Sequence, residues 1–218
     1  MKSNFKSKLK QIDKRKIIFT LLILLIALSF STAALTPVSR YDNKTAQYRI
    51  YLSPSNQYRN TYADNTTNEM EQCDKIAAAT KEKLEAYGFN VMLGKSGDRI
   101  ENRCIESDNF NADLHVPIHT NALNGDYTGG TFVFVLGENE YQLAEDVLSE
   151  LAPLSPGNED RIEFKPALYE INTPKAETVY IECEFHDTLE GCEFIKNNTD
   201  KIAQAIADGI YKYFSDRE

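Results

Sequence analysis

The feature that most constrains this chain is an alternation of short apolar runs with longer amphipathic segments, which begins at residue 48. Residues 69–87 place apolar or weakly polar side chains at the i, i+3, i+4, i+7 spacing of an amphipathic helix, and Gly88 ends it. The whole order predicts an α/β fold in a single domain, a mostly parallel twisted sheet flanked by helices. We expect strands at 48–52, 89–93, 113–119, 131–136 and 178–183, and further helices at 98–110, 139–151 and 198–214.

The amino end is typical of a targeting segment. Residues 1–16 hold seven basic groups and one acid, and residues 17–35 carry no charge. A basic flank of this kind stays in the cytoplasm, so the rest of the chain is delivered outside. The apolar run is long enough for a membrane anchor, while Ser31-Thr32-Ala33 offers a cleavage site for a signal peptide. Both alternatives predict an extracytoplasmic protein, held in the cell envelope or secreted.

Three segments follow from this pattern. We expect a basic flank with a signal peptide or membrane anchor at 1–35, a polar linker at 36–47 and the folded domain at 48–218. Contact with a membrane would come through the first segment, if it is not cleaved.

The negative charge of the folded part argues against nucleic acid as a partner. The whole chain has a formal net charge of −9, and because residues 1–16 are basic, the remainder carries −15. A body this acidic is not expected to bind nucleic acid. P-loop, G-x-G-x-x-G, G-x-S-x-G and H-E-x-x-H motifs are absent from the sequence, which disfavours nucleotide chemistry and serine hydrolysis.

The four cysteines allow two interpretations. Outside the cytoplasm Cys73, Cys104, Cys183 and Cys192 can form disulfides in three connectivities, and the alternative is four buried free thiols. No C-x-x-C pair exists, so we do not expect them to bind zinc.

The three histidines lie in or just after expected strands. His115 and His119 share one strand face, but four residues of strand separate them by about 13 Å, so at most one of them can bind a given metal ion. His119, at the end of its strand, is the better candidate. We expect His115 to be a hydrogen-bonded core residue, and His186 follows the last strand.

Two glutamates are expected in places where a carboxylate is costly. Glu69 lies on the core face of the first helix, where it serves either as a ligand or as the last member of a capping box with Thr66. Glu182, Glu184 and His186 alternate with apolar residues, which predicts a row of ionisable groups on one face of the strand. Carboxylates beside a histidine suit metal-assisted hydrolysis.

Five short motifs carry more information in combination than singly. They are Ile50-Tyr51-Leu52-Ser53-Pro54-Ser55, then Asn68-Glu69, Arg103 ahead of Ala112-Asp113, Ile118-His119-Thr120-Asn121-Ala122, and Tyr180-Ile181-Glu182. In order and spacing they resemble the zinc-dependent N-acetylmuramoyl-L-alanine amidases of the type 3 family, over roughly residues 48–214.

The resemblance implies a set of site residues. Members of the family bind zinc through a His after the first strand, a Glu that opens the first helix and the His of a His-x-Asn-Ala motif, and a late-strand Glu takes part in catalysis. By this resemblance Glu69 and His119 are zinc ligands and Glu182 is the catalytic acid/base. Asn121 and Arg103 are implied to orient substrate or to be structural.

One position departs from the family pattern. Where the family has its first His, in an Asp-Pro-Gly-His stretch, this chain has Ser53-Pro54-Ser55-Asn56-Gln57. An amide oxygen is a weaker zinc donor than imidazole. Gln57 or His186 is therefore expected as the third ligand, His186 because it extends the strand face that carries Glu182.

The function implied by the resemblance is hydrolysis of the amide bond between N-acetylmuramic acid and L-alanine in peptidoglycan, with Zn²⁺ as cofactor. The alternative is a catalytically inactive amidase-like module that binds cell-wall peptides or regulates another hydrolase. The missing His favours the second function, and the three costly groups Glu69, His119 and Glu182 favour the first.

Overall fold

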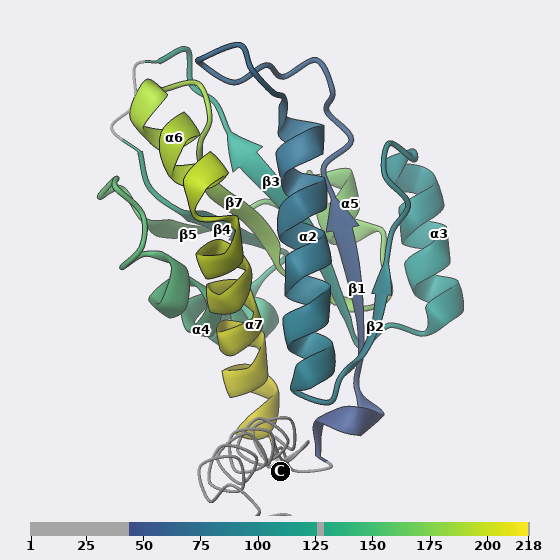
Figure 1. Cartoon of the computed structure of the whole chain (residues 1–218). Coiled ribbons are helices and arrows are strands. Elements are labelled where there is room, and N and C mark those ends of the chain that lie inside the picture. The colour runs from purple at the N-terminus through teal and green to yellow at the C-terminus, as the bar shows by residue number, and fades with distance from the viewer. Residues whose placement is uncertain (1–43, 126–128, 218) are drawn as a thin grey trace, which may run out of the picture. The chain divides into compact units, whose positions relative to one another are not determined.

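The computed structural model describes residues 44–125 and 129–217 (Figure 1). The expected signal or anchor at 1–35 and most of the expected linker lie outside these residues. The described chain begins with a short 3-10 helix, η1 (Thr45–Gln47), in which the buried Thr45 hydroxyl donates to the carbonyl of Tyr87 at 2.5 Å. Across the described ranges, no helix is long and apolar enough to cross a membrane.

The strands form one mixed sheet in which most pairs are parallel. Its order is β2-β1-β3-β7-β4-β5, with β6 paired to β3, and the single antiparallel pair is β4 with β7. The expected α/β fold with a mostly parallel sheet is confirmed. The strands are β1 (Arg49–Pro54), β2 (Asn90–Leu93), β3 (Leu114–Asn121), β4 (Phe132–Val135), β5 (Arg161–Phe164), β6 (Glu177–Thr178) and β7 (Tyr180–Phe185).

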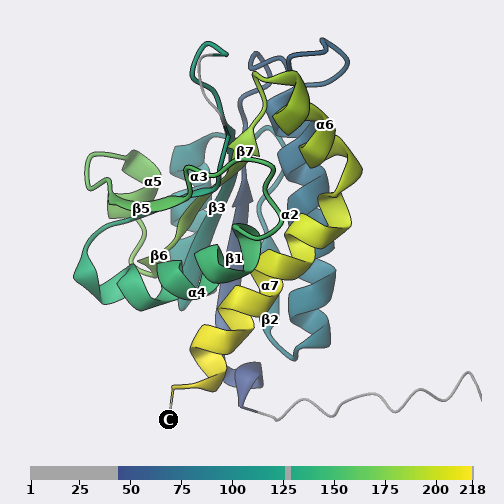
Figure 2. The same cartoon turned by 90° about the vertical axis from the view of Figure 1, so that its left-hand side faces the viewer.

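Helices cover both faces of the sheet (Figure 2). On one face α2 (Glu69–Ala86), α7 (Thr199–Ser215) and α4 (Tyr141–Leu151) bury the main apolar core together with Leu114, Val116 and Ile118 of β3. The other face carries α3 (Ile100–Phe110) and α5 (Tyr169–Asn172), and a smaller apolar cluster between α5 and strands β4 and β7. His115 and His119 alternate with the core residues of β3 and therefore point toward this second face.

Some elements were not expected from the sequence. They include η1, β5, α5, η2 (Glu138–Glu140) and α6 (Leu189–Asn197). Strand β5 is partly exposed and α5 has only four residues, so neither has a strong pattern. Gly191 lowers the helix propensity of α6, but a Cβ there would lie 2.0 Å from the carbonyl oxygen of Phe185, so the close packing of α6 requires this glycine.

All four cysteines are buried and free. Of the two interpretations of these residues, the structure has the free thiols, and the exposed fraction of each is 2% or less. The domain is therefore held by its apolar core rather than by disulfides.

The contact between α4 and α7 generates a prediction about stability. A Cβ on Gly209 would lie 2.5 Å from Cα of Val147 and 2.9 Å from the carbonyl oxygen of Asp146, both of which are backbone atoms that cannot rotate away. We expect Gly209→Ala to lower the free energy of unfolding by about 1–3 kcal/mol, as other overpacked sites do. Urea unfolding followed by circular dichroism measures this change.

The matched control is Gly137→Ala, because a Cβ at Gly137 meets no atom within 4 Å. Equal unfolding midpoints for the two variants would contradict the tight contact between α4 and α7.

Candidate functional site

The candidate site lies at the carboxyl ends of the parallel strands β1 and β3, at the upper end of the sheet in Figure 1. Ligands of open α/β sheets bind at this edge. Three segments meet there: the loop after β1, the first turn of α2 and the last residues of β3. Residues far apart in the sequence are thereby brought into contact.

Glu69 and His119 form the centre of the site. Oε1 of Glu69 lies 2.8 Å from Nδ1 of His119, and both side chains are buried. The amide nitrogen of Gln57 lies 3.3 Å from the same His119 nitrogen and 3.5 Å from the same Glu69 oxygen. Gln57 is exposed, so it is the member of this cluster that meets solvent.

The loop after β1 also holds the second oxygen of Glu69. Asn60 donates from Nδ2 to Oε2 of Glu69 at 2.7 Å and to Oε1 of Gln57 at 2.8 Å. The capping box with Thr66 is therefore wrong. Asn68 caps the helix by accepting from the amide of Glu71 at 3.0 Å, so Glu69 is the first helical residue and its side chain is available to the site.

Glu182 is the neighbour of His119 on the adjacent strand. The two residues are paired in the register of β3 and β7, so their side chains share a face of the sheet. Oε2 of Glu182 is sealed from solvent without a hydrogen-bond partner among the described residues. Burial raises the pKa of Glu182 to about 8, and the positive charge of His119 offsets only part of this effect.

A further carboxylate, which sequence analysis missed, lies on the other side of His119. Oε2 of Glu170, on α5, lies 3.9 Å from Nε2 of His119, and its Oε1 lies 3.4 Å from Nε2 of His115. The hydroxyl of Ser53 also donates to this carboxylate. His115 is buried as expected, with its ring stacked on Tyr51 at a centroid distance of 5.2 Å, but neither of its ring nitrogens makes a hydrogen bond within the described residues, so the expected hydrogen bonding is wrong.

The charges in this cluster follow from these contacts. Burial opposes ionisation of Glu69, yet the hydrogen bond with His119 holds the pKa of this carboxyl below its ordinary value. Burial alone would lower the pKa of His119, but the carboxylates of Glu170 and Glu69 raise it to about 10. The imidazoles of His115 and His119 likewise overcome burial and hold the pKa of Glu170 below its usual range.

His186 does not join the cluster, and the expectation that it extends the face of Glu182 is wrong. His119 pairs with Glu182, but Asn121 pairs with Phe185, so β7 holds one extra residue between these pairs, a β-bulge. The bulge turns His186 to the opposite face. There its ring stacks on Tyr62 at 4.9 Å.

The partners of His186 confirm this orientation. Its Nδ1 lies 2.9 Å from both the hydroxyl and the carbonyl oxygen of Thr120, whose side chain points away from that of His119. Burial lowers the pKa of His186, so it is a neutral core residue at physiological pH.

The two residues implied to orient substrate differ in exposure. Arg103 is 1% exposed, and its guanidinium donates to the carbonyls of Pro54 and Lys95, the latter at 2.9 Å. Arg103 is thus structural, since it fixes the end of β1 and cannot reach a substrate. Asn121 is partly exposed at the rim of the site, and its Oδ1 accepts from the amide of Ala122 at 2.8 Å.

The donor set can be tested against a zinc ion. Two donors of one tetrahedral zinc lie about 3.4 Å apart, which is close to the 2.8–3.5 Å separations among Glu69, His119 and Gln57. However, the atom that Gln57 directs at the other two is its nitrogen, while its oxygen accepts from Asn60. Within the ranges that the structure describes, no group of three or more His, Cys, Asp or Glu is arranged to hold a metal ion. Glu69 and His119 thus suit zinc as two strong donors, and a third would be present only if the amide of Gln57 rotated to present its oxygen.

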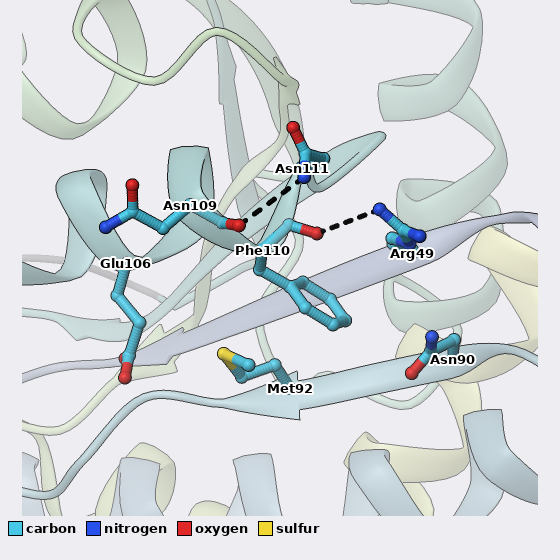
Figure 3. Close-up of a pocket in the computed structure, with 7 residues that line it drawn as sticks. All are labelled: Arg49, Asn90, Met92, Glu106, Asn109, Phe110 and Asn111. Carbon is cyan, nitrogen blue, oxygen red and sulfur yellow. Dashed lines mark hydrogen bonds between the residues drawn. The ribbon is translucent and has the colours of Figure 1, made fainter.

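A separate hollow lies at the other end of the strands and contains none of these residues. It has a volume of about 410 Å³ between the end of α3 and strands β1 and β2. Figure 3 shows Arg49 donating to the carbonyl of Phe110 at 3.3 Å and Asn111 to that of Asn109 at 3.4 Å. It lies at the amino ends of β1 and β2 and has no histidine, so we do not assign the chemistry to it.

Solved structures of amidases have the same fold. The catalytic domain of CwlV, an N-acetylmuramoyl-L-alanine amidase from Bacillus (Paenibacillus) polymyxa var. colistinus, matches with a TM-score of 0.70 and 17% identity, over 78% of this chain and 99% of that one. The N-acetylmuramoyl-L-alanine amidase AmiC2 of Nostoc punctiforme matches with a TM-score of 0.67 and 19% identity, over 78% of this chain and 99% of that one. An N-acetylmuramoyl-L-alanine amidase from Clostridium difficile 630 matches with a TM-score of 0.67 and 22% identity, over 78% of this chain and 98% of that one.

Comparisons of sequence point to the same proteins. No curated protein matches this chain. The family model described as N-acetylmuramoyl-L-alanine amidase matches residues 54–212, which include Gln57, Glu69, His119 and Glu182. The resemblance noted in the sequence is thus confirmed over most of the described residues, and the chain belongs to the N-acetylmuramoyl-L-alanine amidase family.

Proposed function

We propose that this protein hydrolyses the amide bond between the lactyl group of N-acetylmuramic acid and L-alanine in peptidoglycan, with zinc as its cofactor. The observation that carries the proposal is the meeting of Glu69, His119 and Glu182 at the carboxyl edge of an amidase-family sheet. Buried ionisable groups are seldom stabilising in themselves and gather where chemistry uses them.

In this proposal Glu69 and His119 hold the zinc, with the side-chain oxygen of Gln57 as a weak third ligand. Bound zinc would polarise the scissile carbonyl and make a bound water more acidic. Glu182 accepts the proton of the attacking water and passes it to the leaving amine. Without the ion, burial raises the pKa of Glu182 to about 8; a divalent cation beside it would lower this pKa, so that Glu182 is ionised when it accepts the proton. Asn121, at the rim, is proposed to orient the substrate.

The proposed place of action is outside the cytoplasm, where peptidoglycan lies. Residues 1–35, with their basic flank and uncharged run, support export of the domain that follows. The protein would be released by cleavage or stay attached to the membrane through this segment.

A specific observation also favours a second candidate function. The Gln57 amide nitrogen donates to Glu69 and faces His119, so it makes contacts within the cluster that do not require a cation. A relative that has lost zinc could keep this arrangement and bind wall peptides without cleaving them. Metal content and wall digestion separate the two functions.

We expect purified protein to contain zinc and to release peptides with a free amino-terminal L-alanine from purified peptidoglycan. A chelator should abolish this release and added zinc should restore it, because the proposed water activation depends on the ion. Binding to peptidoglycan without release, and without bound metal, would support the second candidate function and contradict the first.

Glu182→Gln should reduce peptide release by at least about 100-fold, because an amide of the same shape cannot accept a proton. The control is Glu163→Gln on β5, a partly exposed carboxylate away from the site, which should keep full activity. Unchanged release in the Glu182→Gln variant would remove Glu182 from the mechanism.

The same Glu182 variant has a second expected effect, on stability in metal-free protein. The folded carboxyl keeps its proton to about pH 8, whereas the ordinary pKa of a glutamate is 4.5. The unfolded state therefore releases the proton first, and wild-type stability falls as the pH rises between these values. Gln has no proton to lose, so the stability of Glu182→Gln relative to wild type should rise across this window in urea unfolding.

Gln57→His should raise the affinity for zinc at least about tenfold, because imidazole is a better zinc donor than an amide oxygen. Competition with a chromophoric chelator measures the dissociation constant. Tyr58→His is the matched control, since it adds an imidazole one residue away on a 58% exposed side chain. Equal affinity in Gln57→His and wild type would mean that position 57 is not a ligand position.

A further inference from the structure

Glu170 is the least expected charged group in the domain. It lies on α5, a four-residue helix in the connection between β5 and β6, yet its side chain is 4% exposed. Its neighbours are Nε2 of His115 at 3.4 Å, Nε2 of His119 at 3.9 Å and the hydroxyl of Ser53. Glu170 thus lies at the centre of a second layer of polar groups directly behind the candidate zinc ligands.

The fold alone does not explain this carboxylate. Removing a carboxylate from water costs several kcal/mol, and an apolar residue of similar volume would pack against Ile171 and its neighbours without this cost. The contacts of Glu170 are instead with two imidazoles, one of which belongs to the site. This placement indicates a role that acts through His119.

The two ring nitrogens of His119 have different environments. Nδ1 points to Oε1 of Glu69, the shared donor position, at 2.8 Å. Nε2 is buried, without a hydrogen bond among the described residues, and the carboxylate of Glu170 is its acidic neighbour. A histidine that binds a metal through one nitrogen usually donates the N–H of the other to a carboxylate, which fixes the tautomer and strengthens the ligand.

We propose that Glu170 is a positioning residue of the site: its carboxylate faces the Nε2–H group of His119 and orients the ring, so that Nδ1 is directed at the metal position. The 3.9 Å separation is longer than a hydrogen bond, and such contacts in ligand-free sites often tighten when the ligand binds. The inference rests on the proposed zinc site.

The same arrangement explains how a weak third ligand is tolerated. Gln57 offers an amide where the family has an imidazole, so His119 and Glu69 must supply most of the binding. A carboxylate behind His119 makes that imidazole a stronger donor. The hydroxyl of Ser53 donates to the other oxygen of Glu170 and holds it in place, and Nε2 of His115, whose ring is stacked on Tyr51, lies 3.4 Å from the same oxygen.

The experiment compares full-length wild type with Glu170→Ala and Glu170→Gln by two measurements. Chelator competition gives the zinc dissociation constant. The ¹H chemical shift of the Nε2–H group of His119, in metal-free protein at neutral pH, reports the contact of this group with the Glu170 carboxylate. We expect Glu170→Ala to weaken zinc binding about 10–100-fold. The Nε2–H proton should move upfield in this variant, because no carboxylate then lies beside it to deshield it.

Glu170→Gln tests whether hydrogen bonding is the cause. Its side-chain oxygen can still accept from Nε2–H, so it should keep most of the wild-type proton shift and recover most of the zinc affinity. Glu140→Gln, which changes another buried carboxylate, on η2, should leave both measurements unchanged. If Glu170→Ala does not fold, Glu170→Asp, which withdraws the charge by one methylene, should shift both measurements in the same direction.

Three outcomes are decisive. An unchanged Nε2–H shift in Glu170→Ala would overturn the proposal, and so would equal zinc affinities in Glu170→Ala and Glu170→Gln. If wild type binds no zinc, the proposed cofactor fails, whereas the Nε2–H shift of metal-free protein still decides whether Glu170 orients the ring of His119.

Discussion

The contact between Glu69 and His119 is the interaction on which the site depends. It joins the first residue of α2 to the end of β3, two segments that the parallel topology brings to the same edge. Both groups are nearly removed from water, so each needs the other to compensate for lost hydration. Because the helix begins at Glu69, a shift of the Asn68 cap by one residue would rotate the carboxylate away from His119.

The β-bulge in β7 decides which groups join this pair. Up to Glu182 the register of β7 follows β3, so Glu182 lies beside His119 on one face. The extra residue then reverses the alternation, and His186 faces Tyr62 and Thr120 on the opposite side. Because of this one inserted residue, His119 supplies the imidazole of the site without His186, and the groups around His119 are carboxylates.

The sequence was sufficient for those parts of the site that have a local pattern. Amphipathic spacing gave α2, strand alternation gave the faces of His115 and His119, and the cost of burying Glu69 and Glu182 marked them as unusual. The bulge could not be predicted, because a strict period of two continues through Glu184 and His186 in the sequence. The register depends on pairing with β3, which is not encoded in β7 alone.

The role of Glu170 and the contacts of Arg103 were beyond sequence analysis for a related reason. Glu170 lies on a helix too short to have a period, and its contacts are with residues more than fifty positions away. The burial of Arg103 depends on two carbonyls at the ends of β1 and β2, whose approach is set by tertiary packing. In both cases the contacting residues are distant in the chain, so neither composition nor spacing predicts the contacts.

The balance of charge connects these observations. Without a cation, the carboxyls of Glu69 and Glu170 are readily ionised, because their pKa values are held below the ordinary value. The pKa of the His119 imidazole is raised, so this ring is positively charged. The pKa of Glu182 is also raised, which keeps this carboxyl protonated. A third negative charge is unfavourable because the surroundings already carry a net negative charge and exclude water. A divalent cation reverses this condition, since it supplies positive charge beside the carboxylates and favours ionised Glu182. The ionised form is the one that a general base requires, so in a site with this charge balance, loading of the metal and activation of the base are coupled.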